Sequence, residues 1–348
     1  MKRMGVRARH CLAALLAAAA MTGAMPSSAV AGILRGVNIS GGEFAGGGAP
    51  GTLDVNYTYP TKAEIDYYYN LGMRVIRVPF MWERLQPTLN GGLSAVDRQK
   101  LRDVVTYATG KKMFVVLDMH NYARRAVGAN YSKVALIGST DVPVAALSNG
   151  WIKIASDYKT NDRVWLGLMN EPYGISAAQW WPIAQKVVSD IRGASIANKI
   201  LVPGTSWTGA HSWASSGNAA QAEVFRDPWN NVAFEVHQYL DADSSGKSDQ
   251  CSVGAGARVA SVINWAKAQR KWLFMGEMAA AGTTDRCKIE YRDMLNRIES
   301  SGVFFGWTAW GGGTWWVPTY PFWTLTKQWP AGTQRSSHLS LLLERMGK

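Results

Sequence analysis

Two glutamates stand where short apolar runs of the sequence end. Glu171 follows VWLGLM in the stretch LMNEP, and Glu277 closes the stretch FMGE. Alone, Glu171 could equally cap a following helix, and Glu277 could equally pair with a surface lysine. If the two carboxyl groups meet at one site, one can keep its proton while the other stays ionised. Acid–base and nucleophilic catalysis need such an arrangement.

Other polar or aromatic residues occupy comparable positions. Arg77 lies inside the apolar run VIRVPF, and a buried guanidinium needs a carboxylate partner. Each histidine of this kind could be an ordinary core residue, and the tryptophan could be plain core. The combination is much harder to obtain by accident, and it favours one functional site. The further residues that end apolar runs are Asp118, His120, Asn170, His237, Tyr239 and Trp310.

Glycoside hydrolysis is the chemistry that this set of residues fits best. It uses one carboxylic acid that protonates the leaving oxygen and one carboxylate near the anomeric carbon. Arg77 and the Tyr239 hydroxyl would keep the second carboxylate ionised. The chain also has 16 tryptophans. Their flat rings suit the apolar faces of a sugar polymer, although many of them could simply be core.

Eight apolar, β-rich runs are spaced along the chain, with helical patterns between them. Such continuous apolar runs are typical of parallel strands buried on both faces. Eight alternations predict the α/β class and a single-domain (β/α)8 TIM barrel, whose active site lies at the carboxyl ends of its strands. An open doubly wound sheet is the alternative, but no G-x-G-x-x-G follows the first run. The predicted strands are 33–39, 75–80, 113–119, 164–169, 200–202, 232–239, 272–275 and 303–310.

Helix starts are also visible in the sequence. Thr61 with Glu64 forms a capping-box pattern, and Ser94 with Asp97 opens a second helix. Helical spacing predicts three further helices, of which the last would close the barrel. These stretches are 176–191, 257–268 and 336–346.

The first 31 residues are typical of a secretory signal peptide. Residues 1–9 carry four basic side chains and no acidic one, residues 11–25 are almost entirely apolar, and Ala29-Val30-Ala31 supplies an A-x-A cleavage site. The apolar run is short for a membrane anchor. We therefore expect cleavage after Ala31, a catalytic barrel over 32–348, and a secreted protein, either periplasmic or extracellular.

Composition argues against several other classes of protein. The formal net charge is +12, but part of it lies in the predicted signal peptide and the other Lys and Arg residues are scattered. We therefore expect no nucleic-acid binding. No second apolar run is long enough to span a membrane, so we expect no membrane contact of the mature protein. Five histidines without H-E-x-x-H or clustered Cys/His spacing indicate no metal and no cofactor. We expect a monomer.

Cys251 and Cys287 are the cysteines that remain after the predicted cleavage. An even pair in an exported chain favours a disulfide, with two free buried thiols as the alternative. In the chain-entropy account, such a bond would stabilise the fold by roughly 3–4 kcal/mol.

In its motifs the chain resembles glycoside hydrolase family 5, and within it the cellulases (endo-β-1,4-glucanases). The resemblance covers essentially the whole predicted mature chain. HQYLDADSSG, AWGGGTWW and the cysteine positions resemble the subgroup of fungal endoglucanases and their bacterial relatives. Unlike in many members, we expect no appended cellulose-binding module. The residues that carry the resemblance are Arg77 in RVPF, His120 in DMHNY, Asn170-Glu171-Pro172, His237-Gln238-Tyr239, Gly276-Glu277 and Trp310.

The resemblance implies a retaining double displacement on a β-glucan, without a cofactor. Glu171 would be the general acid/base and Glu277 the nucleophile, with their carboxyl groups about 5–5.5 Å apart. Asn170 would bind the sugar 2-hydroxyl. Arg77 and Tyr239 would hold Glu277 ionised and oriented.

The other family positions would shape the sugar site. His237 would lie near Glu171 on the leaving side, and His120 near the sugar hydroxyls. Trp310 would form the floor under the sugar, and Trp207, in GTSWTG, is our candidate for a leaving-side platform. Four further tryptophans are weaker platform candidates, for which core packing is equally open: Trp82, Trp213, Trp315 and Trp316.

Alternatives to an endoglucanase stay open at this point. The same fold could act on mannan, xyloglucan or mixed-linkage glucan, because loop shape decides the polymer. A secreted carbohydrate-binding protein without catalysis is a different class, but it would have no need of both Glu171 and Glu277. A Ser-His-Asp hydrolase is poorly supported, because GTSWT lacks the final glycine of G-x-S-x-G.

Overall fold

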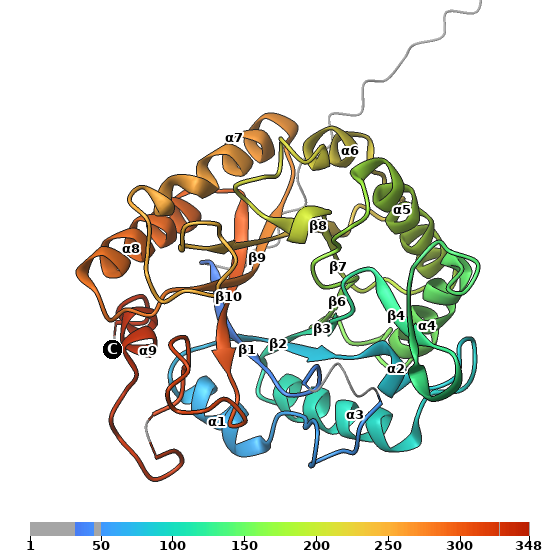
Figure 1. Cartoon of the computed structure of the whole chain (residues 1–348), viewed down its shortest axis with the longest axis horizontal. Helices are drawn as coiled ribbons and strands as arrows, with labels where there is room; N and C mark the ends of the chain where they lie inside the picture. The colour runs from blue at the N-terminus through green and yellow to red at the C-terminus, as the bar shows by residue number, and fades with distance from the viewer. Residues whose placement is uncertain (1–31, 45–49, 327, 348) are drawn as a thin grey trace, which may run out of the picture.

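The structure is a computed structural model that describes residues 32–44, 50–326 and 328–347. Its centre is a closed barrel of parallel strands surrounded by helices (Figure 1). The predicted signal peptide lies outside the described residues. Within the described part, no helix combines the length and the apolar character that crossing a bilayer requires.

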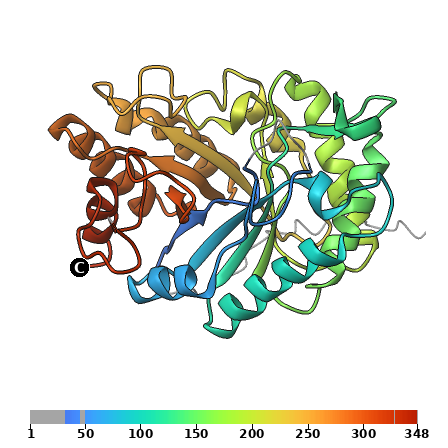
Figure 2. The same cartoon turned by 60° about the horizontal axis from the view of Figure 1, so that its bottom comes forward.

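All eight predicted strands form the barrel, and the prediction of a (β/α)8 fold is confirmed. Neighbouring strands pair in parallel in the closed order β1-β10-β9-β8-β7-β6-β3-β2. Because all strands run the same way, their carboxyl ends share one mouth of the barrel. Figure 2, turned by 60° from Figure 1, shows the barrel strands obliquely. The strands are β1 Leu34–Ile39, β2 Val75–Phe80, β3 Phe114–Met119, β6 Val164–Gly167, β7 Ile200–Pro203, β8 Val232–Tyr239, β9 Leu273–Ala279 and β10 Phe304–Gly312.

Helices cover the outside of the barrel (Figure 1). The capping box at Thr61 is present, because its hydroxyl accepts from the Glu64 N–H while Glu64 accepts from the Thr61 N–H at 2.8 Å. Ser94 likewise caps its helix through the Asp97 N–H. The helix predicted over 257–268 begins later than expected, because its first turn is a 3-10 segment. The helices are α1 Lys62–Asn70, α2 Trp82–Leu85, α3 Ala95–Gly110, α4 Val144–Ser156, α5 Ala177–Gly193, α6 Asn218–Val224, α7 Ala260–Gln269, α8 Asp285–Ser300 and α9 Ser337–Glu344.

A two-stranded antiparallel hairpin, β4 (Arg124–Val127) with β5 (Lys133–Leu136), was not predicted from the sequence. It lies beside α4 in Figure 1, between β3 and α4 in the chain. The buried Glu83 of α2 holds it, because its carboxylate accepts from the Ala126 N–H at 2.5 Å and from the Asn121 amide at 2.7 Å. The hairpin therefore stands at the mouth, directly after β3.

Two of the candidate platform tryptophans are core residues instead. Trp82 is fully buried and donates its indole N–H to Gln86 at 2.8 Å. Trp213 is fully buried and packs against Trp181 and Phe234, with ring centroids 5.9 and 6.1 Å away. Their apolar surface stabilises the helix–barrel packing and is closed to a sugar.

The predicted disulfide is confirmed. Cys251, in the segment after β8, bonds to Cys287 in the first turn of α8, with Cα atoms 5.1 Å apart. In the same segment the Asp241 carboxylate accepts the N–H groups of Gly246 and Lys247 at 3.1 and 3.2 Å. These contacts fix the long connection that follows the strand bearing His237 and Tyr239.

Candidate active site

Glu171 and Glu277 meet at the mouth of the barrel. Glu171 follows β6, and Glu277 lies in the second half of β9. One carboxylate oxygen of each lies within 4.8 Å of the other and of a ring nitrogen of His237. The strands therefore bring together the two carboxyl groups that the sequence placed at separate strand ends, close enough to act on one anomeric centre.

Glu277 is held by one hydrogen-bond donor on each carboxylate oxygen. Arg77 donates to Oε1 at 2.9 Å, and the Tyr239 hydroxyl donates to Oε2 at 2.7 Å. The His237 Nδ1 lies 3.7 Å from Oε2. Burial alone would raise the pKa of Glu277, but His237, Arg77, His120 and the Tyr239 hydrogen bond lower it below the ordinary value. This carboxylate is therefore kept ionised.

Arg77 is fully buried and organises the floor of the site. Besides Glu277, its guanidinium contacts Asp118 at 2.9 Å and Glu235 at 3.0 Å. Its second terminal nitrogen donates to the Asn170 side-chain oxygen at 2.8 Å. Burial would lower the pKa of Arg77, but the carboxylates around it raise it, so the guanidinium stays charged. The carboxylate partner predicted for Arg77 is present, and there are three such partners: Asp118, Glu235 and Glu277.

Two members of this network were missed in the sequence. Asn38 of β1 accepts from Arg77 at 2.9 Å. Glu235 of β8 contacts Arg77 and also lies 3.2 Å from the Nε2 of His237. The signal for Glu235 was present, because Glu235, His237 and Tyr239 alternate along β8 and therefore share one face. Asn38 in the apolar run ILRGVNI carried a similar, weaker signal.

Gly276 makes room for Glu235. A Cβ at this position would lie 2.1 Å from the Glu235 Oε1. The pairing of β8 with β9 also skips Gly276, because Val236 faces Met275 and His237 faces Glu277. The glycine of the G-E motif therefore serves the close approach of a buried carboxylate.

Glu171 has different surroundings. Its Oε1 lies 2.8 Å from the His237 Nδ1, and its backbone φ of 39° is rare for a residue with a side chain. Burial raises the pKa of Glu171 above the ordinary value, and the nearby Glu277 raises it further. The hydrogen bond with His237 opposes this shift but does not cancel it. His237 itself has its pKa raised to about 10, because Glu277, Glu171 and Glu235 outweigh its burial.

His120 and Asn170 form a chain of side chains next to Glu277. Arg77 fixes the Asn170 carbonyl oxygen, so the Asn170 amide N–H points at the His120 Nε2, 3.1 Å away. The other ring nitrogen of His120 lies 2.7 Å from Asp118. Nδ1–H donates to Asp118, which fixes the orientation of the ring. Both predicted residues lie in the site with fixed orientations.

An aromatic wall lies on the Trp310 side of the site. Trp310 stacks with His120, with centroids 5.7 Å apart and planes 21° apart, and donates to the Tyr320 hydroxyl at 3.1 Å. Trp316 stacks on Tyr320 at 4.1 Å and lies 6.0 Å from Trp310. Trp316 therefore belongs to this wall, whereas Trp315 is a half-buried residue of the same loop.

A second aromatic group lies next to Glu171. Trp207 is 54% exposed and stacks on Tyr173, with centroids 5.1 Å apart and planes 5° apart. The guanidinium of Arg124, from the hairpin, covers the Tyr173 ring at 3.8 Å. The backbone N–H of Trp207 donates to the backbone carbonyl oxygen of Pro172, which directly follows Glu171 in the chain. Tyr173 and Arg124 were missed, because their order in the chain does not show this stacking.

Glu171, His237 and Glu277 offer three ligand atoms close enough together for a metal ion. These atoms already contact one another, with opposite shifts of the two carboxyl pKa values. That arrangement suits acid–base work without an ion, and the absence of a metal and of a cofactor stays a prediction.

A closed (β/α)8 barrel whose mouth holds two carboxyl groups with oppositely shifted pKa values, between two aromatic walls, defines a glycoside hydrolase of the two-carboxylate class. The model of the cellulase family (glycosyl hydrolase family 5) matches residues 36–313. The chain belongs to this family, and it is a glycoside hydrolase of the cellulase (endo-1,4-β-glucanase) type.

Relatives and solved structures agree with this family. The chain is 32% identical to Endoglucanase 1 of a Robillarda species over 84% of this chain and 81% of that protein. It is 34% identical to Endoglucanase 3 of Humicola insolens over 81% and 70% of the two chains. The structure of XacCel5A in complex with cellopentaose is similar at a TM-score of 0.83 and 40% identity, covering 90% of this chain and 99% of that one. The endo-β-1,4-glucanase Xac0029 of Xanthomonas axonopodis pv. citri matches at a TM-score of 0.82 and 37% identity, over 91% and 100%.

Proposed function

We propose that the protein is a secreted endo-β-1,4-glucanase that cleaves internal bonds of cellulose and related β-glucans with retention of configuration. The observation that carries the proposal is the pair Glu171 and Glu277, within 4.8 Å of each other and with pKa values shifted in opposite directions. In retaining enzymes the carboxyl groups lie about 5–5.5 Å apart, too close for an intervening water.

In the first step Glu277 attacks the anomeric carbon and Glu171 gives its proton to the departing glycosidic oxygen. The C–O bond to the leaving sugar breaks as the bond to the Glu277 oxygen forms. Arg77 and Tyr239 orient the attacking carboxylate through their hydrogen bonds. His237, 3.2 Å from Glu235, remains charged beside Glu171 and stabilises the carboxylate that proton transfer leaves there.

In the second step water attacks the glycosyl–Glu277 ester. Glu171, now ionised, takes the proton of this water, and the bond to Glu277 breaks to release the sugar. Asn170 would donate its amide to the sugar 2-hydroxyl, because Arg77 already fixes its carbonyl oxygen. His120 would contact neighbouring hydroxyls.

The two aromatic groups support a groove for a neutral glucan chain. Trp310 would lie under the sugar that becomes bound to Glu277. Trp207 would be the leaving-side platform, because its loop contacts Pro172 next to the acid. The complex of XacCel5A with cellopentaose supports a β-1,4-glucan as the substrate.

The mechanism is tested by the anomer that forms first. Proton NMR of freshly cleaved cellohexaose should show the β-anomer before mutarotation, and release of the α-anomer would contradict retention. Endo action should lower the viscosity of carboxymethylcellulose well before most reducing ends are released. Faster hydrolysis of glucomannan or xyloglucan than of carboxymethylcellulose and barley glucan would instead assign a different polymer.

Secretion and the monomeric state have their own tests. Mass spectrometry of the protein exported by its producing cells should show an amino terminus at Gly32, as cleavage after Ala31 requires. Retained residues before Gly32 would contradict that cleavage site. Light scattering of the mature protein should give the mass of one chain.

A further inference from the structure

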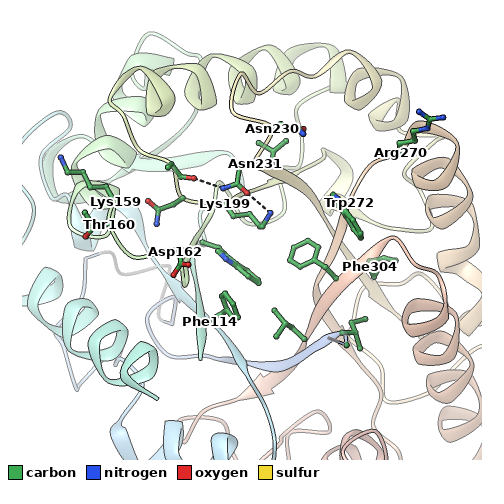
Figure 3. Close-up of a pocket in the computed structure, with 18 of the residues that line it drawn as sticks. Phe114, Lys159, Thr160, Asp162, Lys199, Asn230, Asn231, Arg270, Trp272 and Phe304 are labelled. Carbon is green, nitrogen blue, oxygen red and sulfur yellow. Dashed lines mark hydrogen bonds between the residues drawn. The ribbon is translucent and has the colours of Figure 1, made fainter. Parts of the chain in front are cut away.

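A cavity of about 810 Å³ lies at the end of the barrel opposite the two glutamates. Its lining comes from the amino-terminal starts of the strands, which in a parallel barrel share one end: Leu34, Phe114, Val232 and Phe304, with Trp272 just before β9. Figure 3 shows Phe114, Trp272 and Phe304 around a common space. Nothing in the hydrolytic mechanism uses this cavity.

Aromatic rings form much of the cavity wall. Phe114 packs on Trp165, with centroids 4.7 Å apart, and Trp165 on Phe305 at 5.4 Å. Trp165 is buried, but Phe114, Phe305 and Trp272 keep part of their surface open. Leaving apolar ring surface open costs about 25 cal/mol per Å² of surface that could be buried. A ligand with flat apolar faces would cover that surface.

The polar groups of the cavity have hydrogen-bonding capacity to spare. The Lys199 ammonium donates to the Asn231 side-chain oxygen at 2.9 Å and lies 5.4 Å from the centre of the Phe305 ring (Figure 3). Burial and nearby Arg192 lower the pKa of Lys199, so a further acceptor would stabilise its charge. Asn198 is 4% exposed, and its side-chain oxygen has no hydrogen-bond partner within the described part of the chain.

The charge of the lining fits a neutral ligand. Glu299 is already paired with Arg35 through two contacts of 2.9 and 3.0 Å. Arg270 points away from the centre of the cavity in Figure 3. The lining also holds the oppositely charged Lys159 and Asp162. It therefore gathers no charge of a single sign, whereas an anion site needs several converging charged donors. Side-chain amides next to exposed aromatic rings suit a ligand that carries hydroxyl groups around a ring with apolar faces.

We propose that this cavity is a second carbohydrate site, which binds a short segment of β-glucan away from the catalytic mouth. The rings would cover the apolar sugar faces, and Lys199, Asn198 and Asn231 would bind hydroxyls. The volume is that of an ordinary small-molecule site. The choice of polymer rests on the proposed function. Two separate sites on one chain would raise the apparent affinity for a polymer that reaches both.

Calorimetric titration with cellohexaose tests the proposal. The mature Glu277→Gln protein is the parent, so that the sugar is not consumed. It should bind about two cellohexaose molecules per chain, and adding Trp272→Ala should leave about one. Ala197→Trp should also leave about one, because Ala197 is an exposed lining residue and a large side chain there fills the cavity.

Two matched controls should keep both sites. Trp265→Ala removes an indole of similar burial from α7, and Ala220→Trp adds one at an exposed position of α6, neither of them in the lining. If Trp272→Ala fails to fold, the comparison of Ala197→Trp with its control Ala220→Trp still tests the proposal. A crystal of the parent grown with cellohexaose should show sugar in the cavity.

One site in the parent, or a second site that survives Ala197→Trp, would overturn the proposal. So would a crystal of the parent grown with cellohexaose in which sugar occupies the mouth and none occupies the cavity. These outcomes are separate from failure of the proposed function, which would appear as the unsubstituted enzyme leaving barley glucan and carboxymethylcellulose intact.

Discussion

The interior of the barrel is packed by opposite means near its two ends. At the mouth, Arg77 is fully buried among Asp118, Glu235 and Glu277. At the other end, a buried cluster of aliphatic and aromatic side chains that includes Leu201 and Phe274 fills the interior. Buried charge is expensive and seldom stabilises as well as apolar packing of the same volume. The mouth is therefore the end where stability is given up for chemistry, and the opposite end compensates.

The largest loss of activity from a change at the mouth is expected for Glu277→Gln. It keeps the shape of the side chain and removes the proposed nucleophile, so kcat/KM on carboxymethylcellulose should fall by about 10⁴-fold or more. The control is Glu290→Gln in α8. Glu290 is also a buried carboxylate, but it accepts the Gly254 and Gly256 N–H groups and lies 3.4 Å from Arg286, none of which belongs to the site. Its loss should lower thermal stability and leave kcat unchanged. Turnover of Glu277→Gln near that of the parent would refute the assigned role.

Gly276→Ala tests whether the mouth depends on packing as tight as that of the opposite end. The new methyl group would lie 2.1 Å from the Glu235 Oε1, so Glu235 must move and disturb both Arg77 and His237. We expect a loss of about 100-fold in kcat and about 1–3 kcal/mol of unfolding free energy. Gly193→Ala, where the methyl group meets nothing within 4 Å, is the control. Equal behaviour of the two variants in kinetics and denaturant melts would show that Glu235 is not needed.

The same comparison shows what a sequence can reveal. Strand ends could be predicted because parallel strands have apolar runs, and polar residues after those runs must share one mouth. Glu235 could have been found by its alternation with His237. The hairpin could not, because RRAV and KVAL are too short and mixed to show a period.

The tryptophans show the limit of sequence patterns. Trp82 and Trp316 were equal candidates, yet one is core and the other belongs to the wall of the site. Composition gives no sign of this, because the difference lies in which side of a loop or short helix packs on the barrel. The stack of Trp207 on Tyr173 likewise joins two loops that only the closed barrel brings together.

Tyr239→Phe sharpens the comparison by removing one hydrogen bond at the mouth while keeping the packing of the ring. Its hydroxyl stabilises the ionised form of Glu277, so its removal should raise the pKa of that group. In the proposed mechanism activity requires ionised Glu277, so it is lost as pH falls through this pKa. The acidic limb of kcat/KM should therefore move up by about 0.5–1 pH unit, with about a 10-fold lower plateau. The basic limb, which belongs to protonated Glu171, should stay. A shift of the basic limb alone would instead indicate that Glu277 is the general acid and Glu171 the nucleophile.

Trp207→Ala should affect only substrates that reach beyond the acid. The exposed ring adds apolar contact on the proposed leaving side, and removing it should raise KM for cellohexaose about 3–10-fold. Hydrolysis of an aryl cellobioside, whose leaving group is not a sugar, should change less. Trp207→Tyr keeps an aromatic face and is the matched control. A uniform loss on both substrates would mean that Trp207 positions Glu171 and is no platform.

The smallest effect on activity is expected from Leu201→Ala at the opposite end. Leu201 is fully buried in β7 within the apolar cluster, and its truncation should cost about 2–5 kcal/mol of unfolding free energy. Leu201→Met, which keeps the volume, should cost less than about 1.5 kcal/mol. Both variants should retain the parental kcat at temperatures where they stay folded, as measured beside denaturant melts. Because β7 also leads to the Trp207 loop, a fall in kcat in the folded variant would show that packing at one end controls geometry at the other.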